Sequence, residues 1–116
     1  MKETIISIAK WHEETFPDAT LDGQKVKYTE ELHEWEESQY EDISELADMF
    51  IVACGIARFD LAQGLLYMAD LYDQFVGNDS IGVDEVMSKV EQKMEKNRKR
   101  IWEKVGDGTF HHTNKE

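Results

Sequence analysis

The stretch Ile43-Ser-Glu-Leu-Ala-Asp-Met-Phe-Ile-Val-Ala-Cys-Gly-Ile-Ala-Arg-Phe59 decides the fold, because its apolar residues cover every side of a helical wheel. A helix that is apolar all round needs other elements around it, so we expect it at the centre of the molecule. In a chain of 116 residues such cover is hard to supply. The sequence therefore predicts a central helix and favours a homodimer or homotetramer that completes its burial.

Four other segments carry apolar residues at helical spacing: 3–15, 23–38, 61–76 and 83 to about 102. Pro17 separates the first two, and Gly77-Asn-Asp-Ser80 separates the last two. Alternating strand patterns are absent. We therefore predict an all-α helix bundle of about five helices in a single domain over residues 1–105, followed by an extended C-terminal arm over residues 106–116.

The net charge of the chain limits the classes of partner that it is expected to bind. Asp and Glu total 25 against 13 Lys and Arg, a formal net charge of −12. This charge repels a polyanion, so we expect no nucleic acid partner. A phosphorylated small molecule is still compatible, because a bound divalent cation reverses the sign of the local field. The sequence holds no apolar stretch of membrane-spanning length and no signal segment, so we expect a cytoplasmic protein without a membrane partner.

Acidic residues stand at i and i+3 in two short segments. The first is Glu30-Glu31-Leu-His-Glu34, and after ten intervening residues the second is Glu45-Leu-Ala-Asp48. On a helix this spacing puts both carboxylates on one side, with Cβ atoms about 5–6 Å apart. We expect the two pairs to face each other and to form a nest of four carboxylates, which consists of Glu31, Glu34, Glu45 and Asp48.

The second pair is the more informative, because the helix that carries Glu45 and Asp48 is otherwise apolar up to Arg58. Burial of an unpaired carboxylate is costly, so a partner is needed, and a metal ion is a natural one. In the alternative interpretation, Glu45 and Asp48 favour a helix N-terminus through the helix dipole, and the first pair is a solvated acidic face. The combination of both pairs favours the metal.

Hard oxygen ligands without a matching histidine or thiolate indicate Mg²⁺, with Mn²⁺ as a possible substitute. Glu30 and His33 form one Glu-x-x-His pair, which is typical of ferritin-like di-iron bundles. Such bundles use two of these pairs, and the second is missing from this sequence. The ligand pattern therefore favours magnesium over iron.

These acids resemble the motif of the MazG-type all-α nucleoside triphosphate pyrophosphohydrolases, which is Glu-Glu-x-x-Glu followed after a variable gap by Glu-x-x-Asp. The gap of ten residues is shorter than usual in that family. With Trp11, Thr15-Phe16-Pro17 and Gln24 ahead of the motif, the chain looks closest to phage and bacterial dATP/dGTP diphosphohydrolase-like members. The resemblance implies that the four acids hold Mg²⁺ and that the chain hydrolyses nucleoside triphosphates.

A second similarity lies downstream, in a segment that resembles the Lys-x-x-x-Asn-x-x-Arg stretch of dCTP pyrophosphatases. It places Lys93, Asn97 and Arg100 at i, i+4 and i+7, on one face of a helix. The resemblance implies that these three residues contact the nucleotide and its phosphates. From the residues alone, a solvated basic helix end that balances the helix dipole is equally open.

Aromatic and histidine residues add weaker candidates. Trp102 is a candidate for stacking on a nucleotide base, whereas Trp11 and Trp35 are at helical spacing with other apolar residues and are expected in the core. His111 and His112 lie in a tail similar to the Asp-Gly-Thr-x-x-His ending of some phage members. That tail either folds over a neighbouring site or, as termini commonly do, extends into solvent.

The expected function is Mg²⁺-dependent hydrolysis of (deoxy)nucleoside triphosphates to monophosphate and pyrophosphate. For the catalytic role of orienting or deprotonating the attacking water we choose Glu34. The alternative from another class is a non-catalytic acidic helical interaction protein, such as a phage-type adaptor or DNA mimic. It explains the net charge of −12, but it does not explain acids on the apolar helix.

Overall fold

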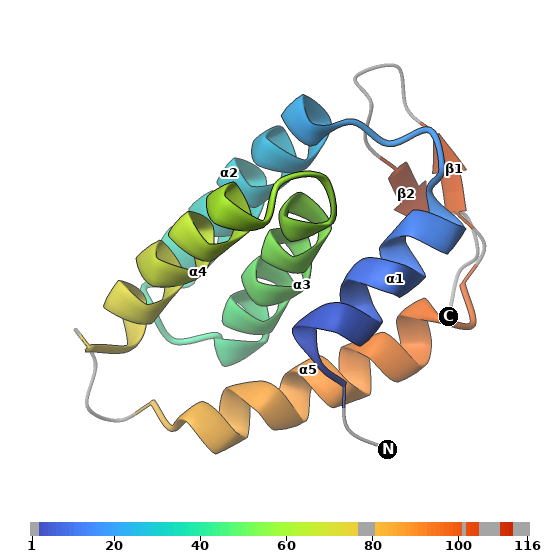
Figure 1. Cartoon of the computed structure of the whole chain (residues 1–116). Helices are drawn as coiled ribbons and strands as arrows, with labels where there is room; N and C mark the ends of the chain where they lie inside the picture. Colours follow the sequence, from blue (N-terminus) through green and yellow to red (C-terminus); the bar gives the residue numbers. More distant parts are fainter. Residues whose placement is uncertain (1–2, 77–80, 101, 105–109, 113–116) are drawn as a thin grey trace.

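The computed structural model describes residues 3–76, 81–100, 102–104 and 110–112 (Figure 1). The described residues form five α-helices: α1 (Ile5–Thr15), α2 (Leu21–Glu37), α3 (Ile43–Phe59), α4 (Leu61–Val76) and α5 (Val83–Asn97). The predicted all-α fold class is confirmed, as is the order of the helices. Within the described chain, every helix is too short or too polar to cross a membrane.

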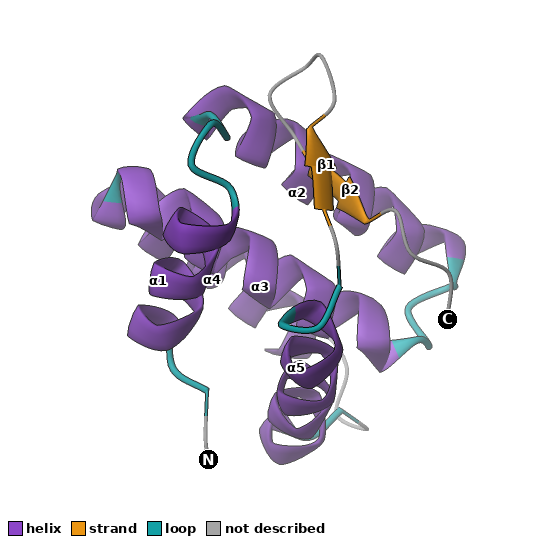
Figure 2. Cartoon of the chain, turned by 90° about the vertical axis from the view of Figure 1, so that its right-hand side faces the viewer, coloured by secondary structure: helices purple, strands orange, loops and turns teal. Residues whose placement is uncertain are grey.

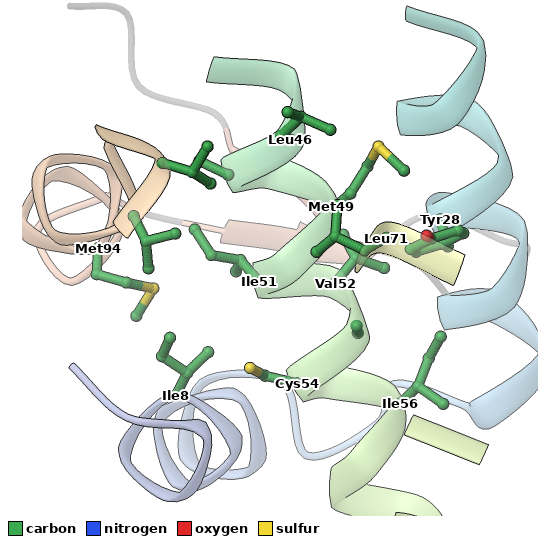
Figure 3. Packing of buried hydrophobic residues seen from close by; sticks show 14 of the residues in the cluster. Ile8, Tyr28, Leu46, Met49, Ile51, Val52, Cys54, Ile56, Leu71 and Met94 are labelled. Carbon is green, nitrogen blue, oxygen red and sulfur yellow. The ribbon is translucent and has the colours of Figure 1, made fainter. Parts of the chain in front are cut away.

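The helix α3 lies at the centre, as its sequence predicts. Each of the other four helices makes its main contacts with α3, and Figure 1 shows α2 and α4 on one side of it and α1 and α5 on the other. In Figure 3, Ile8 and Met94 approach α3 from one side, and Tyr28 and Leu71 lie on the other. The apolar helix is therefore covered by elements of its own chain.

The burial of α3 by its own chain removes the reason for which an oligomer was predicted. Nine residues of α3 are buried within a single chain, so its burial does not require a second copy. The large apolar residues that stay exposed are concentrated on α4 instead: Leu61, Leu65, Leu66 and Tyr72. Oligomerisation stays a prediction, and the α4 face is the observation that now favours it.

The turn between α2 and α3 sets the geometry of the predicted site. Gln39 and Tyr40 both adopt positive φ angles, of 60° and 61°, which reverse the chain within a few residues. The backbone N–H of Tyr40 donates to the carbonyl of Trp35, and the side chain of Asp42 caps α3 by accepting from the N–H of Ser44. This reversal brings the acidic end of α2 back against the acidic start of α3.

A buried polar cluster fixes α3 against α1 and α2. Arg58 Nη1 lies 3.0 Å from Nδ1 of His12 and donates to the carbonyl of Phe16 at 2.8 Å. Burial lowers the pKa of His12 to about 4, so the ring is neutral and also interacts with Gln24. Gly55 leaves the space that His12 and Gln24 occupy, because a Cβ at this position would be 2.8 Å from Gln24 Oε1. The cluster holds α3 in position about two turns or more beyond Asp48, which belongs to the predicted site.

The end of α5 differs from the prediction. The helix was expected to reach Trp102, but it ends at Asn97. Its buried stripe consists of Val86, Val90 and Met94, and the run of cations that follows adds no apolar side chain to extend it. After Asn97 the chain continues in i to i+3 turns, in which the N–H of Lys99 donates to the carbonyl of Lys96 and that of Arg100 to the carbonyl of Asn97.

Two short strands follow α5, which the sequence did not predict. The strand β1 (Trp102–Lys104) pairs antiparallel with β2 (Phe110–His112), with Glu103 opposite His111 (Figure 2). Part of the predicted C-terminal arm over residues 106–116 therefore pairs back on the chain. The boundary between domain and arm at residue 105 stays a prediction, because residues 105–109 and 113–116 are outside the described part.

Candidate metal and substrate site

Three carboxylates from two helices meet near the turn between α2 and α3. Glu31, Glu45 and Asp48 each offer one oxygen atom, and these oxygens lie within 4.8 Å of one another. Glu31 comes from α2, while Glu45 and Asp48 lie one turn apart on α3. The sequence analysis predicted all three as metal ligands, and the structure brings them together.

The cluster is partly shielded from solvent and incompletely hydrogen-bonded. Glu31 is only 7% exposed, although it is a charged residue type. Oε2 of Glu31 and Oε2 of Glu45 are buried, and neither accepts a hydrogen bond from the described residues. Lys27 lies 3.6 Å from the other oxygen of Glu31, which is the helical ion pair that the spacing suggests. Two buried acceptor atoms of the cluster residues thus lack a donor among the described residues.

Burial and mutual repulsion raise the pKa values of all three acids. Burial, followed by the neighbouring Glu34 and Asp48 carboxyls, raises the pKa of Glu31 to about 9. Burial and the charge of Asp48 raise the pKa of Glu45 to about 7. The pKa of Asp48 is also raised by burial, although Lys93 opposes the shift. Without a cation, like charges at this spacing favour protonated carboxyls over carboxylates.

Glu34 lies beside the cluster at its more open side. Its side chain is exposed, yet it interacts with the side chains of both Glu31 and Glu45. It is outside the tight set of three oxygens. Its place is compatible with a fourth ligand or with a group that contacts a water on the solvent side, and its assignment as ligand and catalytic residue stays a prediction.

The donor set fits a hard divalent cation. It consists of carboxylate oxygens from Glu31, Glu45 and Asp48, with Glu34 next to them, and no histidine or cysteine joins it among the described residues. Such oxygen ligands suit Mg²⁺ and Mn²⁺. A divalent cation would also satisfy the two orphaned oxygens and offset the repulsion that raises the pKa values. The residues present therefore fit the predicted metal.

A pocket of about 250 Å³ opens between the acid cluster and α5. Asp48 lies on one wall, and the predicted residues Lys93, Asn97 and Arg100 line the opposite side. The remaining lining residues are Ser44, Lys89, Gln92 and Lys96. The structure therefore places one predicted acid, Asp48, and three of the predicted substrate residues in one cavity. The other members of the acid cluster, Glu31 and Glu45, adjoin Asp48 and do not line this pocket.

Lys89 and Lys96 are functional candidates that the sequence analysis missed. They stand four residues before and three residues after Lys93, so they share its face of α5. That helical spacing is present in the sequence, but Lys89 and Lys96 are outside the Lys-x-x-x-Asn-x-x-Arg motif. With them, the pocket gathers four cationic side chains on one helix and its end, which suits an anion with several charged oxygens.

Arg100 shows a further unsatisfied group. Its Nη1 donates to Oδ1 of Asn97 at 3.3 Å, while its Nε is buried and donates to no described residue. Lys93 instead contacts the acid cluster, with Nζ 3.0 Å from both carboxylate oxygens of Asp48. The pocket therefore holds an arginine with spare donor capacity and a lysine that joins its basic wall to the acids.

The remaining candidates lie away from this cavity or outside the described side chains. Glu30 and His33 are exposed and do not belong to the acid cluster, so the di-iron alternative gains no support from them. The backbone of Trp102 begins β1, but its side chain is outside the described part, and its role as a stacking residue stays a prediction. The same holds for the side chains of His111 and His112.

Comparison with known proteins adds one distant relative. No family model matches the chain, and no solved structure matches it. A dATP/dGTP diphosphohydrolase of Salmonella phage PMBT28 is 30% identical over 105 residues. The match covers 90% of this chain but 29% of that protein, so the chain spans less than a third of its relative's length. The chain is therefore similar to one part of a phage dATP/dGTP diphosphohydrolase.

Proposed function

We propose that the chain is a metal-dependent nucleoside triphosphate pyrophosphohydrolase of the MazG type. The observation that carries this proposal is the position of Asp48, which belongs to the acid cluster with Glu31 and Glu45 and also lines the pocket whose cations come from α5 and its end. A metal–triphosphate complex presents both charges that such a cavity favours, a divalent cation and a chain of phosphate oxygens. The similarity to the phage dATP/dGTP diphosphohydrolase supports a deoxynucleoside triphosphate as the substrate.

The proposed reaction is attack of water on the α-phosphorus. A bond forms between the water oxygen and phosphorus, the bond to the β-phosphate oxygen breaks, and the products are a nucleoside monophosphate, pyrophosphate and a proton. Glu31, Glu45 and Asp48, with Glu34, hold Mg²⁺, for which Mn²⁺ substitutes. When bound, this cation neutralises phosphate oxygens and lowers the pKa of a bound water.

The protein side chains have separate tasks in this proposal. Lys93, Asn97 and Arg100 bind the phosphates, and the exposed position of Glu34 beside the cluster suits it to accept the proton of the attacking water. Trp102 is kept as a base-stacking candidate. The negative net charge of −12 is compatible with a small phosphorylated substrate and unfavourable for nucleic acid. A homodimer or homotetramer in the cytoplasm is part of the same proposal.

The test is a panel of all common dNTPs and NTPs with Mg²⁺, in which monophosphate and pyrophosphate are both quantified. We expect Glu45→Gln to abolish turnover and to leave the helical circular dichroism unchanged, because the change removes one charge without changing the shape of the side chain. Glu41→Gln is the matched control, since Glu41 is exposed just before α3. Glu41→Gln should keep wild-type activity, and EDTA should stop turnover in this variant and in the wild type.

Full activity of Glu45→Gln, or hydrolysis that persists in EDTA, would contradict the site assignment. Silence of the wild-type protein across the whole panel would instead favour the acidic interaction protein. In that case, a stoichiometric protein partner recovered without hydrolysis is the expected finding.

A further inference from the structure

Lys93 connects the acid cluster to the basic lining of the pocket. Its Nζ lies 3.0 Å from Oδ1 and 3.0 Å from Oδ2 of Asp48, so the ammonium group sits across both carboxylate oxygens. Each side chain is 29% exposed, which makes the ion pair partly shielded from solvent. Asp48 also belongs to the cluster with Glu31 and Glu45. The ammonium group of Lys93 therefore contacts a carboxylate that is predicted to bind the metal.

This contact conflicts with a divalent cation in the same cluster. An ammonium group on both oxygens of Asp48 competes for the lone pairs that a metal would use, and it repels a second cation at that distance. A lysine side chain has a flexible four-carbon stem, so its charge can move by several ångströms without any change in the helix. Asp48 on α3 is fixed more tightly, because the residues on either side of it, Ala47 and Met49, are buried.

We propose that Lys93 is a placeholder cation that holds Asp48 while the metal is absent, and that it moves to a phosphate oxygen when the metal binds. The metal and Lys93 therefore exclude each other from Asp48. The assignment of the phosphate to a nucleoside triphosphate rests on the proposed function, whereas the competition for Asp48 does not.

The pocket provides a destination for the released lysine. Lys93 lines it together with Lys89, Lys96 and Arg100, and the Nε of Arg100 is buried without an acceptor among the described residues. An anion bound there would accept from Arg100 and from a Lys93 that has left Asp48. A bound metal displaces Lys93 from Asp48 and frees it for a phosphate oxygen, and a bound phosphate draws Lys93 away from Asp48, where it competes with the metal. Metal and triphosphate therefore favour each other's binding.

The test measures Mn²⁺ affinity of the whole chain without any nucleotide, from the electron paramagnetic resonance signal of free Mn²⁺. In Lys93→Met the competing cation is gone, and we expect Mn²⁺ to bind about tenfold tighter or more than in the wild type, within the usual range of coupling between sites. Lys89→Met is the matched control. It removes the same charge from the same pocket, but Lys89 has no contact with Asp48 in the described structure, and its effect should stay within about threefold.

Lys93→Arg is the second variant, because it keeps a cation at the position and protects the test against a folding defect in Lys93→Met. We expect its Mn²⁺ affinity to stay close to that of the wild type. An affinity of Lys93→Met no tighter than that of Lys89→Met overturns the proposal, and so does an absence of Mn²⁺ binding in every protein.

Failure of this proposal and failure of the proposed function give different results. If the wild type hydrolyses nucleotides and Lys93→Met binds Mn²⁺ no tighter, the function stands and the placeholder role is wrong. If Lys93→Met binds Mn²⁺ tighter but no nucleotide is hydrolysed, the competition for Asp48 stands, and the pocket serves another phosphate compound.

Discussion

Glu31 lies on the inward side of α2, where a carboxyl group lowers the stability of the protein unless a cation compensates it. Its side chain is 7% exposed, one oxygen has no donor among the described residues, and burial raises its pKa to about 9. Nζ of Lys27 lies 3.6 Å from Oε1 of Glu31 and compensates the charge of this carboxylate only in part. A residue that costs stability in the metal-free protein is typical of a functional site.

We therefore predict opposite effects of Glu31→Gln on stability and on metal binding. The amide removes the buried acid, so the melting temperature of the metal-free protein at pH 8.5 should rise by a few degrees, about what a gain of 1 kcal/mol gives in a small domain. The rise in melting temperature that Mg²⁺ gives the wild type should disappear. Thermal unfolding followed by circular dichroism, with and without Mg²⁺, measures both quantities.

Glu37→Gln is the control for that measurement, since Glu37 is an exposed acid at the end of the same helix. It should leave both quantities unchanged. If Glu31→Gln still gains as much stability from Mg²⁺ as the wild type does, Glu31 is not a metal ligand.

Much of the site was predictable at this scale, because the i, i+3 spacing of acids is a local property of the sequence. The ion pair between Lys93 and Asp48 was not, since the two residues are 45 positions apart and meet only through packing of α3 against α5. The contact between His12 and Arg58 was missed for the same reason. Sequence spacing shows which residues share a helix face, but not which faces meet.

At the scale of the element, the contact between α3 and α4 depends on a glycine. A Cβ at Gly64 would lie 2.5 Å from Cβ and 2.6 Å from Cα of Ala57, which is closer than packed atoms approach. Because one of these atoms belongs to the backbone, α4 has to move away from α3 to accept a side chain there. The pair Gly64 and Ala57 therefore sets the distance between the two helices.

We predict that Gly64→Ala destabilises the protein by about 1–3 kcal/mol or more, which is the usual cost of overpacking. Urea denaturation followed by circular dichroism measures it. Gly82→Ala is the matched control, because a Cβ there would meet only the Glu85 side chain, at 3.5 Å or more, and its cost should be smaller. Equal losses in the two variants would show that the close contact between α3 and α4 does not account for the effect, because the lower backbone entropy of alanine in the unfolded chain favours folding in both.

The element boundaries show where sequence patterns are informative. The bounds of α3 and α4 match the predicted segments, because long apolar patterns end at Phe59 and before Gly77. The end of α5 and the two strands were not predicted. A segment of three residues is too short to carry a periodic pattern, so pairing between β1 and β2 leaves no signal in the sequence.

For the whole molecule, the raised pKa values link stability to pH and to metal. The folded state holds the protons of Glu31 and Glu45, with pKa values of about 9 and about 7, in a range where the unfolded chain has already lost them. Since the folded state binds more protons, the free energy of unfolding falls as pH rises above the unfolded value near 4.5 and through these two pKa values.

We predict that the metal-free protein loses stability between pH 6 and pH 9 and that Mg²⁺ restores more of it at pH 9 than at pH 6. The cation binds the ionised carboxylates, so its binding also releases protons at neutral pH. Melting temperatures across this range, with EDTA or with Mg²⁺, check the prediction. A gain in melting temperature from Mg²⁺ that is larger at pH 6 has the wrong sign and would contradict it.

The exposed apolar residues of α4 bear on the assembly of the whole molecule. Leu61, Leu65, Leu66 and Tyr72 are each more than half exposed, at 61%, 51%, 70% and 61%. At about 100° per residue, Leu61, Leu65 and Tyr72 share one face of α4, and an exposed apolar face of this kind is typical of a protein–protein contact. Since α3 is already covered by its own chain, this face is the surface that a second copy would bury.

We therefore predict that the 13.5 kDa chain forms at least a dimer in sedimentation equilibrium and that Leu65→Lys shifts it towards the monomer. A charge in the middle of an apolar contact costs desolvation that an exposed lysine avoids. Ile6→Lys is the control, because Ile6 is 80% exposed on α1, away from this face, and the change adds the same charge. A wild type that sediments as a monomer contradicts the prediction, and equal dissociation by both variants would place the contact elsewhere.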